Sequence, residues 1–167
     1  MSGPTIDRAN SSSDIWTPVE FINAVEEKFG PLDTDLAASG SQSAKASRWI
    51  TPEEDSLKQD WFTLLCGGLG WDNCPYSNIT PWARKHAEER QKGAETLLLV
   101  PGSIGANWYW NFVEPYAHVI SVGRMCFDNC FDRRTGKLVT TVYAKDLILC
   151  HYEPGVAPRR MERWRWK

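Results

Sequence analysis

The chain has 167 residues, enough for one domain with a substantial buried core. No apolar run approaches the ~20 residues that cross a bilayer, and the polar N-terminus lacks the apolar centre of a secretory signal. The five cysteines are odd in number and contain no CxxC pair, which favours a reduced, cytoplasmic protein. Cys126, Cys130 and His118 could be imagined around zinc, but their spacing is a poor match, so we expect no metal.

Helix signals occupy the first half of the chain. After a polar lead over residues 1–13, which we expect to be disordered, the apolar spacing of residues 18–29 predicts a helix that Gly30-Pro31 ends. Glu20 and Glu54 each follow a threonine by three residues, which predicts two capping boxes. Three Thr-Pro pairs have the composition of helix starts: Thr17-Pro18, Thr51-Pro52 and Thr80-Pro81.

Strand and helix patterns then alternate. Strands are predicted near 32–37, 69–73, 95–101, 117–122 and 147–152, and helices near 81–92 and 105–114. This alternation predicts a single α/β domain over residues 14–155, with a largely parallel central sheet and flanking helices. Ligands of such sheets bind beyond the carboxyl ends of the strands, where Asp35 and Asn73 fall.

The run Asn73-Cys74-Pro75-Tyr76 has the composition of a site that modifies an exocyclic amino group on a flat ring. The Asn73 side-chain carbonyl and the backbone carbonyl of Cys74 can each accept one hydrogen of an amino group. Tyr76 can stack on the ring, and Pro75 stiffens the turn. The alternative is an ordinary turn after a strand, because Asn, Pro and Ser are common turn residues. The position of Asn73 at a strand end favours the functional interpretation.

Five pieces follow one another in one order, and together they resemble the phage DNA N6-adenine methyltransferase family. They are Trp16-Thr17-Pro18, the run Gly30 to Ser39, Asp55-Ser56-Leu57 with Asp60-Trp61, Asn73 to Tyr76, and Gly123-Arg124 with Phe127. The resemblance covers about residues 14–152. It implies a Rossmann-like methyltransferase sheet and S-adenosylmethionine as methyl donor. It also implies double-stranded DNA as substrate, with methylation of a flipped-out adenine at specific sites that protects phage DNA against restriction.

The resemblance also implies roles for particular residues. The catalytic motif is Asn73, Cys74, Pro75 and Tyr76, and the cofactor-binding residues are Trp16, Thr17, Pro18, Asp35, Ala37, Ala38, Ser39 and Asp55. Asp35 would bind the ammonium of the methionine moiety, directly or through water. Asp55 would lie near the cofactor's adenine, although a simple helix-start charge explains it equally well. The reaction requires no catalytic histidine, so His86, His118 and His151 are interpreted as surface or strand residues.

One departure from the family concerns Cys74, where proline is usual. Its backbone carbonyl remains available, but the turn is less rigid. Two alternatives to DNA methylation therefore stay open. One is methylation of RNA adenine or protein glutamine, which similar motifs perform, and the other is a non-catalytic relative that binds DNA or cofactor.

Basic residues gather in the last third of the chain. From residue 120 onward, ten Lys/Arg face five Asp/Glu, whereas residues 1–119 carry nine against sixteen. We predict a DNA-reading hairpin near 123–141 and a basic aromatic tail over 156–167 that contacts DNA. The alternative interpretation of the tail is a frayed basic end. The expected DNA-binding residues are Arg124, Arg133, Arg134, Lys137, Arg159 and Arg160. The sequence carries no signal of oligomeric state. Trp108-Tyr109-Trp110 is interpreted as core packing or a pocket wall.

Overall fold

The computed structural model describes residues 16–41, 43–132, 135 and 137–167. The helices are α1 (Val19–Phe29), α2 (Trp61–Leu65), α3 (Thr80–Lys92) and α4 (Asn107–Phe112), with 3-10 turns η1 (Pro52–Glu54) and η2 (Ser56–Lys58). The strands are β1 (Leu32–Asp35), β2 (Arg48–Trp49), β3 (Leu69–Asp72), β4 (Glu95–Pro101), β5 (His118–Gly123), β6 (Cys126–Asp132), β7 (Lys137–Val142), β8 (Leu147–Tyr152) and β9 (Glu162–Arg163).

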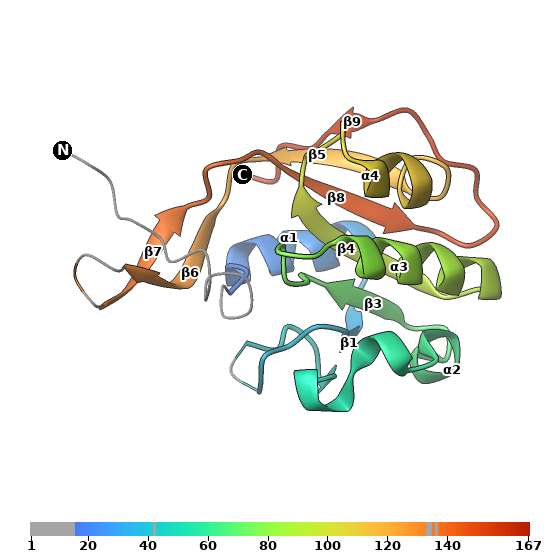
Figure 1. Ribbon diagram of the computed structural model, residues 1–167, viewed down its shortest axis with the longest axis horizontal. Coiled ribbons are helices and arrows are strands. Elements are labelled where there is room, and N and C mark those ends of the chain that lie inside the picture. The colour runs from blue at the N-terminus through green and yellow to red at the C-terminus, as the bar shows by residue number, and fades with distance from the viewer. Residues whose placement is uncertain (1–15, 42, 133–134, 136) are drawn as a thin grey trace.

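The described strands form one central sheet and one separate hairpin (Figure 1). The sheet has the order β2-β1-β3-β4-β8-β5-β9, and β6 pairs with β7 in the hairpin. The pairs β1–β2, β1–β3, β3–β4 and β5–β9 are parallel, whereas β8 is antiparallel to both β4 and β5. The expected α/β architecture with a mainly parallel central sheet is therefore confirmed.

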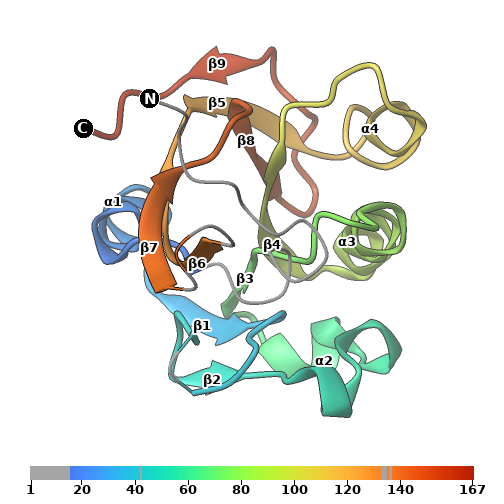
Figure 2. The same ribbon diagram turned by 60° about the vertical axis from the view of Figure 1, so that its left-hand side comes forward.

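Helices cover both faces of the sheet. α1 lies on one face, and α3 and α4 lie on the opposite face (Figure 2). In β4, Leu97 and Leu99 pack with Phe21 of α1, whereas Leu98 and Val100 pack with residues of α3 and α4. Burying one such side chain contributes about 1.5–3 kcal/mol relative to leaving it in water. β4 is therefore buried on both faces.

β3 carries a glycine for a steric reason. A Cβ atom at Gly70 would lie 2.9 Å from Cδ1 of Leu36 and 3.0 Å from Cγ2 of Thr96. Leu36 is fully buried beneath the loop that follows β1. Gly70 therefore lets this loop pack closely against the sheet, and this close packing positions the residues after Asp35.

The Thr-Pro pairs do not all act as predicted. The box of Thr51 and Glu54 forms, but it caps the 3-10 turn η1 rather than an α-helix. The box of Thr17 and Glu20 is wrong, because α1 begins after Pro18 with no side-chain cap. Thr80 is the first residue of α3, which follows Ile79 without a side-chain cap.

The hairpin is separate from the central sheet, whereas a short strand near the C-terminus joins that sheet. β6 and β7 project from the sheet in the predicted region (Figure 1). Arg133 and Arg134, which we predict to bind DNA, lie outside the described residues. Residues 1–13, which we predict to be disordered, lie outside them as well. Near the C-terminus, β9 pairs with β5, and Trp164 and Trp166 pack against the core. These last residues are thus part of the sheet.

In the part of the chain that the structure describes, no helix is long and apolar enough to cross a membrane. No group of three or more His, Cys, Asp or Glu side chains there is arranged to hold a metal ion.

Candidate active site

The loops after β1 and β3 meet at one edge of the sheet. Pairing of Asp35 with Trp71 aligns the carboxyl ends of these parallel strands, and the N–H of Leu36 donates to the Trp71 carbonyl at 2.7 Å. Asp35 and Asn73 consequently line the same hollow, as their positions at strand ends predict. Two recesses open here, and residues 37–39 and Asn73 line both.

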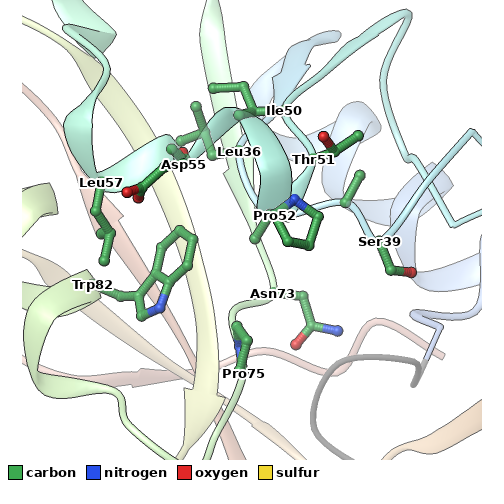
Figure 3. Close-up of a pocket in the computed structure, with 13 residues that line it drawn as sticks. Leu36, Ser39, Ile50, Thr51, Pro52, Asp55, Leu57, Asn73, Pro75 and Trp82 are labelled. Carbon is green, nitrogen blue, oxygen red and sulfur yellow. The ribbon is translucent and has the colours of Figure 1, made fainter.

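The first recess is called the apolar cavity and has a volume of about 210 Å³. Leu36 and Ile50 form its floor, and Pro52 and Asp55 lie opposite Asn73 and Pro75 (Figure 3). The Trp82 indole closes one side (Figure 3). The walls are mostly carbon, so the cavity suits a flat apolar ring with a few polar atoms.

The second recess is called the polar hollow. It is lined by Trp16, Thr17, Asp35, Ser39, Ser43, Lys45 and Asn73 among others. Asp35 is only 4% exposed, and its carboxylate accepts the N–H of Ala37 at 3.1 Å and the N–H of Lys45 at 2.9 Å. Burial raises the pKa of Asp35 to about 6, although both N–H groups and the Lys45 charge oppose this. The hollow therefore contains a carboxyl group that is ready to pair with a cation.

Asn73 is held at both ends of its amide. Nδ2 donates to the Thr17 hydroxyl at 3.1 Å, and Oδ1 accepts the Tyr76 hydroxyl at 2.7 Å. The Tyr76 ring in turn packs edge-on against Tyr143, with 5.6 Å between ring centroids. The amide therefore has a defined position at the boundary of the two recesses.

Cys74 points away from both recesses. Its side chain is 1% exposed and packs with residues of α3, β4 and β8. Burial, and to a lesser extent the charge of Asp72, raise the pKa of the Cys74 thiol well above its ordinary value. The thiol is thus neutral, and Cys74 lines neither recess, whereas the adjacent Pro75 lines the apolar cavity.

The N-terminal motif joins the site to the hairpin. Trp16 and Asp128 of β6 exchange two backbone hydrogen bonds, each of 3.0 Å. Thr17, which is 2% exposed, then reaches Asn73, and Pro18 precedes α1. The structure therefore brings Trp16 and Thr17 to the polar hollow, beside Asp35.

Asp55 lines the apolar cavity and joins η1 to η2. Its backbone is left-handed, with φ of 50°, which is uncommon for a residue other than glycine. Its carboxylate also pairs with Lys58 at 2.7 Å on the exposed side. Such backbone conformations cluster at ligand sites. Asp55 thus lies both in the wall of the apolar cavity and at the turn between two 3-10 segments, so its place agrees with both interpretations made from the sequence.

Trp82 and Lys45 are among the lining residues that were not predicted from the sequence. Trp82 lies in the first turn of α3, and Lys45 lies in the loop between β1 and β2. A signal for Trp82 existed, since the first turn of a helix that begins soon after a strand-end motif lies over that motif. Lys45 offered no local signal, because a single lysine in a polar loop resembles any solvated residue.

The interpretation of His86 as a surface or strand residue is wrong. His86 lies on α3 and is fully buried between Trp61 and Tyr152. Its Nε2 lies 2.8 Å from Asp72 Oδ2, and its Nδ1 lies 2.7 Å from the Thr96 hydroxyl. Burial raises the pKa of Asp72, and the His86 contact opposes this rise. The network ties α3 and β4 to the residue immediately before Asn73.

The basic residues expected to bind DNA lie in different places. Arg124 is exposed beside the end of β5, 3.6 Å from Asp146, and Lys137 is exposed at the start of β7. Arg159 and Arg160 are exposed but precede β9, and the register of β9 with β5 places them near the start of β5. The structure thus groups Arg124 and Lys137 with the hairpin and keeps the other pair apart from it.

Trp110 departs from its expected place. Tyr109 is buried in the core of α3 and α4, as expected, but Trp110 is 57% exposed. The helix has a single buried face, and neighbouring positions on a helix point about 100° apart. Packing accounts for Tyr109, whereas Trp110 faces solvent.

A family model matches most of the chain. Residues 7–160 match the family model for DNA N-6-adenine-methyltransferase (Dam), and the chain therefore belongs to that family. The chain is similar to the DNA N-6-adenine-methyltransferase of Haemophilus phage HP1 (strain HP1c1), with 32% identity over 104 residues, 59% of this chain and 56% of the relative. It is also similar to the protein of the same name from Escherichia phage T1, with 27% identity over 108 residues, 64% of this chain and 44% of the relative. The chain thus spans about half the length of these curated relatives.

Proposed function

We propose that the chain is a site-specific DNA adenine N6-methyltransferase that uses S-adenosylmethionine. The observation that carries this proposal is the place of Asn73, whose amide lies where the polar hollow and the apolar cavity meet. An amino group brought to Asn73 would lie beside the middle of a ligand that spans both recesses. Family membership and the names of the two phage relatives support the same activity.

The two recesses fit the donor's chemistry. Asp35 in the polar hollow offers a carboxylate for an ammonium, and Trp82 with Pro52 and Ile50 offers apolar walls for an adenine ring. Asp55 lies where it could accept hydrogen bonds from the adenosine part. When bound, S-adenosylmethionine supplies a methyl group that its sulfonium already activates. The protein's own task is therefore alignment and exclusion of water.

Asn73 acts on the nucleophile. The adenine amino group is weakly nucleophilic because its lone pair is delocalised into the ring. The Asn73 Oδ1 and the Cys74 backbone carbonyl would each accept one of its hydrogens as positive charge develops, which stabilises the transition state. Tyr76 would stack on the flipped base. Asn73 takes up no proton at neutral pH, so the released proton leaves to water.

We infer that double-stranded DNA approaches along the hairpin. Arg124 and Lys137 are exposed there, and the Trp16–Asp128 bridge connects the hairpin to the recesses. Helices on both faces and the antiparallel β8 beside parallel strands support a Rossmann-like methyltransferase sheet. For the biological role we propose protection of phage DNA against restriction; both relatives are phage proteins, which fits a phage origin of this chain.

Transfer of tritiated methyl groups tests the proposal. The protein is incubated with labelled S-adenosylmethionine and, in parallel, with unmethylated double-stranded DNA, RNA of matched sequence and a glutamine-containing peptide. We expect label in DNA as N6-methyladenine. Label in RNA or peptide alone would assign a different substrate to the same chemistry. Cofactor binding by calorimetry with no label in any substrate would indicate a non-catalytic relative.

A further inference from the structure

Lys45 places a positive charge in the polar hollow beside Asp35. Its backbone N–H donates to Asp35 Oδ2 at 2.9 Å, so the loop that carries Lys45 is anchored on the carboxylate itself. Lys45 is one of the residues that line the same hollow. A cation and an anion therefore face one recess from adjoining segments of the chain.

The ammonium of Lys45 is held at the wall of the hollow. Nζ lies 5.9 Å from the centroid of the Trp16 ring, within the range of a cation–π contact. Trp16 is in turn fixed to β6 by its backbone bridge with Asp128. The side chain is half-buried, and this burial lowers the pKa of Lys45, although the charges of Asp35 and Asp128 oppose the shift. A partly desolvated cation gains more from an added anion than a fully hydrated one does.

We propose that Lys45 is the counter-ion for the carboxylate of the cofactor's methionine moiety, so that the polar hollow recognises an intact α-amino acid zwitterion. This inference rests on the proposed function. Asp35 and Lys45 divide the two charges of the zwitterion between them, with the ammonium on Asp35 and the carboxylate on Lys45. Ser39 and Ser43, whose hydroxyls lie 2.9 Å apart, line the same hollow and supply further polar groups.

The charge pattern predicts which ligands Lys45 distinguishes. S-adenosylhomocysteine carries both charged groups, whereas decarboxylated S-adenosylmethionine keeps the ammonium and lacks the carboxylate. Removal of the Lys45 charge should therefore weaken only the first ligand. Removal of the Asp35 charge should weaken both, because both carry the ammonium.

Calorimetry on the full chain tests this assignment without any measurement of activity. For Lys45→Met, which keeps the length of the side chain, we expect S-adenosylhomocysteine to bind about ten- to hundred-fold more weakly, the range for a charge-assisted hydrogen bond. Decarboxylated S-adenosylmethionine should bind within about three-fold of wild type. Lys45→Arg, which retains the charge, should recover most of the lost affinity and so exclude misfolding as the cause.

Three outcomes would overturn the assignment. Equal weakening of both ligands by Lys45→Met would mean that Lys45 only shapes the hollow. Unchanged affinity for S-adenosylhomocysteine would mean that its carboxylate lies elsewhere, while the proposed function would stand. Wild-type protein that binds neither ligand would remove both this inference and the cofactor site on which it rests.

Discussion

The polar hollow and the apolar cavity share a wall but differ in what they can bind. In the hollow, Asp35 and Lys45 present opposite charges, and backbone N–H groups fix the carboxylate. In the cavity, Trp82 and prolines present mainly carbon. A ligand with a charged end and a flat end can therefore lie across the two recesses in one direction only. Polarity, more than shape, would therefore place the middle of such a ligand beside Asn73.

The largest effect on methyl transfer should come from substitution of Asn73, which lines both recesses. Asn73→Ala removes the acceptor for the target's amino group, so we expect methyl transfer to fall about 100-fold or more. The carboxylate of the polar hollow and the apolar walls of the cavity remain, so affinity for S-adenosylhomocysteine should change little. Single-turnover rates at saturating cofactor and DNA measure the first quantity, and calorimetry measures the second. Near wild-type turnover would remove Asn73 from the reaction.

The next largest effect should be on ligand binding in the polar hollow alone. Asp35→Asn keeps the shape of the side chain and removes its charge, so an ammonium would lose its partner. Charge-assisted hydrogen bonds contribute roughly 1.5–3 kcal/mol, which corresponds to about ten- to hundred-fold weaker binding of S-adenosylhomocysteine. 5′-Methylthioadenosine lacks the amino acid part and serves as the matched control. Equal loss for the two ligands would mean that the hollow and the cavity are not separate binding regions.

Acidic pH should weaken the binding of the ligand's ammonium to Asp35. Burial raises the pKa of Asp35 to about 6 in the free protein, with the Asp72 charge adding to the rise and Lys45 opposing it. An ammonium binds the ionised carboxylate, so affinity should be nearly constant above about pH 7, fall to about half at pH 6 and reach about one tenth at pH 5. Calorimetry with S-adenosylhomocysteine across pH 5–8 measures this, and 5′-methylthioadenosine should show no such dependence.

The stability of the free protein should respond to Asp35 with the opposite sign. The folded pKa of about 6 lies above the ordinary value of 3.8, so the folded state holds this proton more tightly than the unfolded state. The contribution of Asp35 to the free energy of unfolding should therefore decrease as pH rises from about 4 to 6. Comparing wild type with Asp35→Asn over this range isolates that contribution. A carboxylate that stabilised the free protein would show the reverse slope.

Sequence reasoning identified the parts of the site that local patterns encode. The bounds of β4 and β8 agree with the apolar runs, and Asp35 and Asn73 fall at strand ends because turns follow both strands. The capping box at Thr17 failed because the Thr17 hydroxyl contacts Asn73, 56 residues away in the chain. His86 escaped notice because its partners Asp72 and Thr96 come from two other elements. Long-range pairing of this kind leaves no local trace.

A smaller effect should come from the apolar cavity. Trp82→Ala removes an aromatic wall, and aromatic stacking contributes about 0.5–1.5 kcal/mol beyond area burial. We therefore expect S-adenosylhomocysteine and 5′-methylthioadenosine both to bind about three- to ten-fold more weakly, since both carry the adenine. Trp82→Phe is the matched control and should retain most of the affinity. An effect on S-adenosylhomocysteine alone would place the adenine outside this cavity.

The smallest effect should come from Cys74, which faces neither recess. Its thiol is buried among residues of α3, β4 and β8, and burial holds its pKa well above the ordinary range, so no thiolate is available to react. Cys74→Ser should lower the free energy of unfolding by about 1–3 kcal/mol, because a hydroxyl replaces a thiol in an apolar core. At a temperature where the variant is folded, its methyl-transfer rate should stay within about three-fold of wild type, since the backbone carbonyl is unchanged. Thermal melts and single-turnover rates separate the two quantities. Loss of transfer in a folded variant that still binds S-adenosylhomocysteine would show that the sulfur takes part in the reaction. The polar hollow, the apolar cavity and Asn73 would then not include every reacting group.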